Sequence, residues 1–287
     1  MTDVRIRNMI LRFNCPDKPG ILAGVTRVLF EQGCDIRDAA QFGDAQTGRF
    51  FVRMHLTAPA SFGEAEFGAA FGPVAAEKSL DWGLFDLERK PKVLIAVSQH
   101  GHCLNDLLHR WHSGLLPMDI IGVVSNHEVM QSMVEWHKLP FGHLPVTSEN
   151  KSRQESAVLE QMDQTGADLL VLARYMQILT PKMCEALAGR CINIHHSFLP
   201  GFKGARPYDR AHERGVRLIG ATAHYVTSDL DEGPIIEQDV RRVTHATSAQ
   251  EMANLGREIE ASVLARAVRW HVEHRIMLNG NKTVVLA

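Results

Sequence analysis

The chain has 287 residues, of which 45% are hydrophobic and 22% charged, and its formal net charge is −2. This composition is typical of a globular protein, long enough for one large α/β domain or for a small domain joined to a larger one. The charge offers no basic field for a nucleic acid, so we expect no nucleic-acid partner. No apolar run approaches the roughly 20 residues that cross a bilayer, and the first residues lack the features of a secretory leader. We therefore expect no membrane contact and a cytoplasmic location.

The cysteines and histidines do not follow a disulfide or metal-binding pattern. The five cysteines are widely spaced, without a Cys-x-x-Cys pair, which predicts reduced and mostly buried thiols. Among the 15 histidines, the pairs His100/His102 and His195/His196 have no carboxylate or thiolate at ligand spacing. We expect no bound metal.

The first part of the chain has the pattern of a small α/β unit. Hydrophobic spacing and turn residues predict a strand at 5–13, a helix at 21–32, strands at 34–42 and 49–56, a helix at 62–71 and a strand at 79–84. The βαββαβ order that results is that of a ferredoxin-like fold.

A short motif, Asp17-Lys18-Pro19-Gly20, joins the first predicted strand to the first predicted helix. Proline fits the first turn of a helix, and glycine permits close approach of backbone or ligand. The motif resembles that of ACT domains, the small-molecule-sensing modules of amino-acid and one-carbon enzymes; a tight turn without a ligand is the alternative. The resemblance implies that Asp17, Pro19 and Gly20 bind a small amino-acid effector. It also implies a homo-oligomer, because ACT domains commonly bind effectors between paired copies.

A charged segment ending in proline, residues 86–91, marks a domain boundary. We place the ACT-like domain at residues 1–88 and a second domain at 89–287. The second domain begins with strands predicted at 92–98, 118–125, 143–146 and 168–173, alternating with helices that end near 111 and 136 and one that spans 152–165. Further on we expect strands at 191–195 and 218–226, one from 233, a helix at 249–272 and a hairpin at 275–286. This alternation predicts a doubly wound, mostly parallel sheet.

Open α/β sheets bind their ligands at the carboxyl ends of the strands. The first such loop, residues 98–102, has one glycine and fits neither a dinucleotide nor a phosphate-binding loop, so we expect no nucleotide cofactor. In the strand at 191–195, Asn193 and His195 are two residues apart and project from the same face. An amide and an imidazole presented together suit acyl transfer, in which one polarises a carbonyl and the other moves a proton. For these two residues alone, ordinary polar contacts are the alternative.

Three segments in order resemble the formyltransferase fold family that uses 10-formyltetrahydrofolate. They are Asn193-Ile-His195-His-Ser197-Phe-Leu199-Pro200 with Gly204 closing the loop, the turn Asp231-Glu-Gly233-Pro234, and the stretch from Leu170 to Pro181. The resemblance implies that Asn193 hydrogen-bonds the formyl oxygen as it becomes an oxyanion, that His195 shuttles protons, and that Asp231 orients the attacking water and tunes His195. It also implies substrate binding by Arg174, Met176, Ile178, Leu179, Leu230, His196 and Gly204. No cofactor is implied beyond the folate, which is the substrate.

The acceptor of the formyl group depends on other features. Relatives that formylate a ribosyl glycinamide phosphate carry a Gly-Ser-Asn turn after the first strand, where this chain has Ser98-Gln-His-Gly-His. An ACT-like domain before such a catalytic domain, and the hairpin at 275–286, resemble the formyltetrahydrofolate deformylases. The resemblance implies hydrolysis to formate and tetrahydrofolate, which supplies formate for purine synthesis and balances one-carbon pools. On this interpretation His196 and the histidines of residues 98–102 close the space that an amine would occupy.

Two other interpretations stay open. One is a formyltransferase that uses an amine acceptor such as glycinamide ribonucleotide. The other is an amino-acid-binding regulatory protein whose catalytic domain is inactive.

Overall fold

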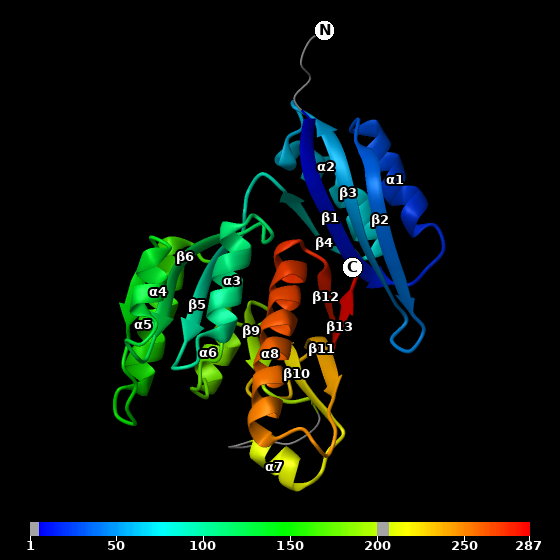
Figure 1. The fold of residues 1–287 in the computed structure, drawn as a ribbon. Coiled ribbons are helices and arrows are strands. Elements are labelled where there is room, and N and C mark those ends of the chain that lie inside the picture. Colours follow the sequence, from blue (N-terminus) through cyan, green and yellow to red (C-terminus); the bar gives the residue numbers. More distant parts are fainter. Residues whose placement is uncertain (1–5, 200–206) are drawn as a thin grey trace. The chain divides into compact units, whose positions relative to one another are not determined.

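The computed structural model describes residues 6–199 and 207–287. Within these ranges no helix is long and apolar enough to span a membrane. The chain forms two compact units, Met1–Lys90 with His274–Ala287, and Pro91–Glu273 (Figure 1). The division lies close to the expected boundary, with one correction: the C-terminal hairpin belongs to the first unit and not to the second domain.

The first unit is a four-stranded antiparallel sheet with two helices on one face. Its elements are β1 (Ile6–Pro16), α1 (Ile21–Glu31), β2 (Asp35–Asp44), β3 (Arg49–Pro59), α2 (Glu64–Lys78) and β4 (Asp81–Asp86), with strand order β2-β3-β1-β4. This confirms the βαββαβ prediction. Helix α2 runs past the predicted end at 71 and through Pro73, because Phe67, Phe71 and Ala75 are spaced four apart and all lie in the core.

The C-terminal residues cover part of the other face of this sheet. They form the hairpin of β12 (Ile276–Asn279) and β13 (Lys282–Val285). Phe51 of β3 is fully buried in a small cluster with Met277, Val284 and Leu286. The amide of Asn279 donates to Asp44 Oδ2 at 2.7 Å. Burial of these apolar side chains explains why the hairpin belongs to the first unit.

The turn before α1 differs from its prediction in one detail. Helix α1 begins at Ile21, with Gly20 as the N-cap residue at φ +84°, so Pro19 lies before the helix and not in its first turn. A side chain at Gly20 would be strained by the left-handed backbone, by about 1–2 kcal/mol. The backbone N–H of Asp17 donates to the Gly48 carbonyl at 2.8 Å and ties this turn to the β2–β3 loop.

The second unit is a seven-stranded sheet with the order β11-β10-β9-β8-β5-β6-β7. Its elements are β5 (Lys92–Val97), α3 (His102–His112), β6 (Asp119–Ser125), α4 (Gln131–Trp136), β7 (Phe141–His143), α5 (Lys151–Thr165), β8 (Leu169–Leu172), α6 (Pro181–Ala186), β9 (Cys191–His195), α7 (Pro207–Glu213), β10 (Leu218–Tyr225), β11 (Ile235–Arg242) and α8 (Ala249–Val272). Strands β5 to β9 are parallel, and β10 and β11 are antiparallel. This confirms a doubly wound, mostly parallel sheet.

Two details of this unit depart from the sequence prediction. The strand expected at 143–146 is Phe141–His143 instead, because Pro145 has no N–H with which to continue a ladder. The short helices α6 and α7 were not predicted. Helix α8 has the expected bounds, begins with a capping box between Ser248 and Glu251, and packs against α3, β10 and β11 (Figure 1).

Replacing Met277 with alanine is expected to lower the free energy of unfolding of the first unit by about 2–5 kcal/mol, because it opens a cavity beside Phe51. Hydrogen exchange followed by mass spectrometry would show faster exchange in β1 and β3. The matched control is Leu278→Ala, whose side chain is 46% exposed and whose loss should change stability by about 0.5 kcal/mol or less. Unchanged exchange in β3 would contradict the placement of the hairpin.

Candidate active site

A cavity of about 630 Å³ lies at the carboxyl ends of the central parallel strands of the second unit. It is lined by residues that follow β5 and β8, by the end of β9 and by the connection from β10 to β11. Asn193, His195 and Asp231 all line it. The sequence prediction that these three side chains share a site therefore agrees with their placement.

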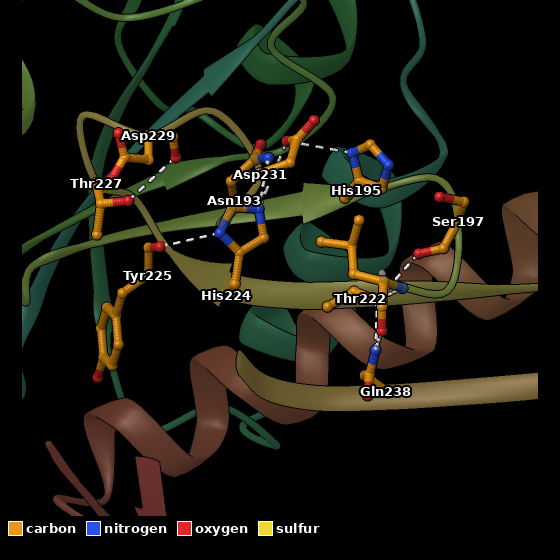
Figure 2. Close-up of polar contacts among 11 residues, drawn as sticks. Asn193, His195, Ser197, Thr222, His224, Tyr225, Thr227, Asp229, Asp231 and Gln238 are labelled. Carbon is orange, nitrogen blue, oxygen red and sulfur yellow. Dashed lines mark hydrogen bonds and ion pairs between the residues drawn. The ribbon is translucent and has the colours of Figure 1, made fainter. Parts of the chain in front are cut away.

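His195 and Asp231 form the ionic pair of this site. His195 Nδ1 contacts Asp231 Oδ1 (Figure 2), at a distance of 3.2 Å, and both side chains are largely buried. The hydrogen bond from His195 is the main cause that lowers the pKa of Asp231, so the carboxyl is ionised. Because Nδ1 donates to a carboxylate, the neutral ring carries its lone pair on Nε2, a buried atom that has no hydrogen-bond partner among the described residues. His195 is thus arranged as a base.

Asn193 is oriented by a residue that the sequence reasoning missed, His224. His224 Nδ1 lies 2.9 Å from the Tyr225 carbonyl oxygen, which can only accept, so Nδ1 donates and Nε2 accepts. Asn193 Nδ2 donates to that Nε2 at 3.2 Å (Figure 2). Burial lowers the pKa of His224, which favours the neutral ring that this arrangement needs. The Asn193 amide therefore has a fixed orientation, with a second N–H left over.

The turn that carries Asp231 is held against β10. A Cβ at Gly233 would lie 1.8 Å from the Tyr225 carbonyl oxygen, so only glycine fits there. The N–H of Tyr225 donates to the Pro234 carbonyl at 2.9 Å. Asp231 itself has a left-handed backbone, φ +59°, which is uncommon for a residue with a side chain. Close packing of the turn thus accounts for the Asp-x-Gly-Pro motif.

A buried carboxylate, Glu260 of α8, organises the side of the cavity near α3. Its side chain is 1% exposed and accepts hydrogen bonds from His102 Nε2 at 2.7 Å and from the Tyr208 hydroxyl at 2.9 Å. Arg174 Nε lies 3.4 Å from Glu260 Oε2. Burial opposes ionisation of Glu260, but the hydrogen bond from His102 and the charge of Arg174 outweigh it and lower the pKa of the carboxyl.

The same cluster includes a group of side chains that could hold a metal ion. His102, Cys103 and Glu260 have ligand atoms within 4.8 Å of one another. Burial raises the pKa of Cys103, which keeps the thiol protonated. The guanidinium of Arg174 beside the carboxylate also opposes a second cation. The chemistry of this group therefore fits a hydrogen-bonded ion pair better than a metal centre.

The predicted substrate-binding residues that the structure describes lie around the same cavity. Arg174, Met176, Ile178, Leu179, Leu230 and His196 all line the cavity, and Gly204 lies outside the described residues. Met176, Ile178 and Leu230 are more than half exposed, so the cavity presents apolar surface to a ligand. The effector residues Asp17, Pro19 and Gly20 belong to the first unit, where all are exposed in the turn before α1.

The segment after β8 that lines the cavity is fixed by buried polar residues of α5. Gln154 donates to the Tyr175 hydroxyl at 2.8 Å, and the backbone N–H of Thr180 donates to Glu155 at 2.9 Å. Most side chains of α5 are polar, and Gln154 and Glu155 are nevertheless both buried. Because both side chains are hydrogen-bonded, their burial costs little, and the same hydrogen bonds keep the segment after β8 in place.

Fold and site together define an enzyme of the formyl transferase class with an ACT domain. The family profile described as formyl transferase matches residues 91–268, and the ACT domain profile matches residues 9–66. The chain is 48% identical over 278 residues to a formyltetrahydrofolate deformylase of Corynebacterium sp. (strain P-1), with 96% of this chain and 97% of that protein covered. The crystal structure of a formyltetrahydrofolate deformylase from Burkholderia mallei matches 98% of this chain and 100% of its own, with a TM-score of 0.94 and 47% identity. The chain belongs to the formyltetrahydrofolate deformylase family.

Transformylases share a smaller part of the chain. A glycinamide ribonucleotide transformylase from Symbiobacterium toebii is 26% identical and has a TM-score of 0.65. The match covers 95% of that protein but 69% of this chain.

Replacing His195 with phenylalanine is expected to raise the pKa of Asp231 towards the ordinary value of about 4, because the hydrogen bond from His195 is the main cause that lowers it. A carboxyl whose pKa is lower in the folded state stabilises the fold above its unfolded-state pKa. That stability is lost as the pH falls through the folded-state value. Carbon-13 NMR of labelled aspartate would follow the titration.

The control for this titration is His196→Phe, because the charge of His196 contributes least to the lowered pKa of Asp231. It should leave the Asp231 titration nearly unchanged. An equal shift in both variants, or none in His195→Phe, would contradict the assigned pair.

Proposed function

We propose that this chain hydrolyses 10-formyltetrahydrofolate to formate and tetrahydrofolate. The observation that carries the proposal is the base Nε2 of His195, backed by Asp231, in one cavity with the fixed amide of Asn193. In the reaction the oxygen of water bonds to the formyl carbon, the bond from that carbon to N10 breaks, and N10 takes up a proton. The formic acid produced releases its own proton at neutral pH.

Each site residue has a role that follows from its contacts. His195 Nε2 takes a proton from water and later returns it to N10, while Asp231 orients the water and stabilises the imidazolium. The free N–H of Asn193 donates to the formyl oxygen as it becomes an oxyanion, a contribution of about 3 kcal/mol in comparable sites. The exposed apolar side chains of Met176, Ile178 and Leu230 bind the pteridine. These steps use the chain's own groups, and we propose that they require no metal or other cofactor.

Water as the acceptor is supported by the full-length relatives. The Corynebacterium and Burkholderia proteins that match along nearly the whole chain are deformylases, whereas the Symbiobacterium transformylase matches 69% of it. The enzyme is then a hydrolase of a C–N bond that acts in the cytoplasm, supplies formate for purine synthesis and balances one-carbon pools. His196, which stacks on His195 at 4.8 Å between ring centroids, takes up space beside the base that an amine would need.

The purified protein is expected to release formate and tetrahydrofolate from 10-formyltetrahydrofolate without an added amine. Asn193→Ala should lower kcat by about 100- to 1000-fold, the usual loss for one oxyanion donor. Asp231→Asn should lower it as well, because the imidazolium loses its counter-ion. Absorbance of tetrahydrofolate and an enzymatic formate assay measure the two products.

The control for this assay is Asp229→Asn, a charge change on the same cavity wall that leaves the pair of Asp231 with His195 intact. It should retain most of the activity. Turnover that begins only when an amine is added would make the enzyme a transferase. No turnover in either case would favour the regulatory protein.

We also propose that the first unit binds a small amino acid at Asp17, Pro19 and Gly20, and that the chain forms a homo-oligomer. Support comes from the ACT domain match at residues 9–66 and from the exposure of the turn. Strand β2 is one of the two edge strands of its sheet among the described residues, and Ile36 and Phe42 are exposed along it. An unpaired edge with apolar side chains is a surface that a second copy can cover.

A small amino acid is expected to raise the thermal unfolding temperature of the parent chain and to leave that of Asp17→Asn unchanged. Differential scanning fluorimetry with each common amino acid, and sedimentation for the subunit number, would measure both. Asp35→Asn, an equal charge change at the start of β2, is the control and should respond as the parent does. A monomer that responds to no amino acid would contradict the proposal.

A further inference from the structure

Arg174 brings a fixed positive charge into the cavity that contains His195 and Asn193. It follows β8, its side chain is 12% exposed, and it is the one arginine or lysine among the described residues that line the cavity. Burial and the charge of Arg174 lower the pKa of the neighbouring His100, which leaves the guanidinium as the lasting cation on that wall.

The guanidinium is held by Glu260 but not saturated. Its Nε faces Glu260 Oε2 at 3.4 Å without the geometry of a hydrogen bond. The two oxygens of Glu260 already accept from Tyr208 and His102. Within the described part of the chain, the two terminal nitrogens of Arg174 have no hydrogen-bond partner of their own. A guanidinium in this state has donors left for a planar anion.

The backbone of Arg174 is strained in order to present this side chain. Its φ is +62°, a left-handed conformation that glycine adopts freely and that costs other residues about 1–2 kcal/mol. The end of β5 fixes it there, because the N–H of Ser98 donates to the Arg174 carbonyl at 3.3 Å and the Ser98 hydroxyl accepts from Met176 N at 3.0 Å. Strain that the surroundings maintain is a mark of functional sites.

Hydrolysis creates an anion that transfer to an amine does not. Formic acid, a carboxylic acid with a pKa of about 4, ionises as it forms. The ionised Asp231 in the same cavity repels the product. A cation that lines the same cavity would offset this repulsion and hold the carboxylate by two parallel hydrogen bonds.

We propose that Arg174, positioned by Glu260, is the formate-binding residue of this site and takes the product carboxylate through its terminal nitrogens after the bond to N10 breaks. The proposal rests on the proposed function, since formate is the product of that reaction. Its ligand class is a small carboxylate, and its site is distinct from the apolar wall formed by Met176, Ile178 and Leu230.

Binding can be measured without turnover by titrating carbon-13 formate into the protein saturated with tetrahydrofolate and following the NMR line width. The test variant is Arg174→Gln with Glu260→Gln, which removes both charges and leaves no buried ion unpaired. Formate should bind about 10- to 100-fold more weakly, the range for a lost charge-assisted hydrogen bond. The matched control is Arg110→Gln with Asp106→Asn, which removes an ion pair of 2.7 Å on α3 and should bind formate as the parent does.

A second variant guards against misfolding of the first. Arg174→Lys keeps the charge next to Glu260 but loses the planar pair of donors, so formate should bind about 10-fold more weakly while thermal unfolding stays close to that of the parent. Formate should likewise inhibit turnover of the parent more strongly than that of the lysine variant.

Equal formate affinity in the parent and both Arg174 variants would overturn the proposal, as would a parent that binds no formate. Failure of the proposed function looks different. It would appear as a parent that releases no formate from 10-formyltetrahydrofolate without an amine, whatever the formate titration shows.

Discussion

The antiparallel pairing of β9 with β10 is the constraint on which the site depends. Its register places His224 opposite Asn193 and Thr222 opposite His195. Directly opposed side chains on one face of a sheet lie within contact distance, so the Asn193–His224 hydrogen bond follows from the register. A slip of one residue would turn every one of these side chains to the other face. The site therefore needs β10 to be antiparallel, at the place where the sheet stops being parallel.

The same pairing also fixes the loop that leaves β9. Thr222, fully buried in β10, accepts from the Leu199 N–H at 3.1 Å and donates to the Ser197 carbonyl at 3.0 Å (Figure 2). Gln238 of β11 donates to the Thr222 hydroxyl and to the Leu199 carbonyl, both at 2.9 Å. Two strands thus satisfy backbone groups of Ser197 and Leu199, which keeps the neighbouring His196 in place beside His195.

How much of the site the sequence could predict depends on the range of the interactions involved. Asn193 and His195 were predictable because alternation along one strand is a local property. His224 and Glu260 were missed because their roles arise from residues 31 and 158 positions away in the chain. The polar His224 within the apolar run of β10 was a usable signal, since a buried polar side chain requires a partner.

The C-terminal hairpin was missed as part of the first unit for a related reason. The prediction of a hairpin at 275–286 is correct. The surface that its apolar residues bury against, Phe51 in β3, lies far away in sequence. Local alternation places Phe51 on the face of β3 that also carries Arg53 and His55, but it does not show what covers Phe51 there. Assignment of a segment to a domain is therefore a long-range property, which composition and periodicity do not contain.

Backbone strain is shared by two oppositely charged residues that line the cavity, Arg174 and Asp231. Arg174 and Asp231 both have a left-handed φ; Arg174 lies just after β8, and Asp231 lies in the connection from β10 to β11. A chain selected for stability alone would place glycine at such positions and gain about 1 kcal/mol at each. Instead one position presents a cation and the other an anion to the same space. Contacts elsewhere in the unit maintain the two strained conformations: Glu260 holds Arg174, and the close packing of Gly233 holds the turn of Asp231. The strain at these two residues is therefore the cost of placing opposite charges in the cavity where the formyl C–N bond is hydrolysed.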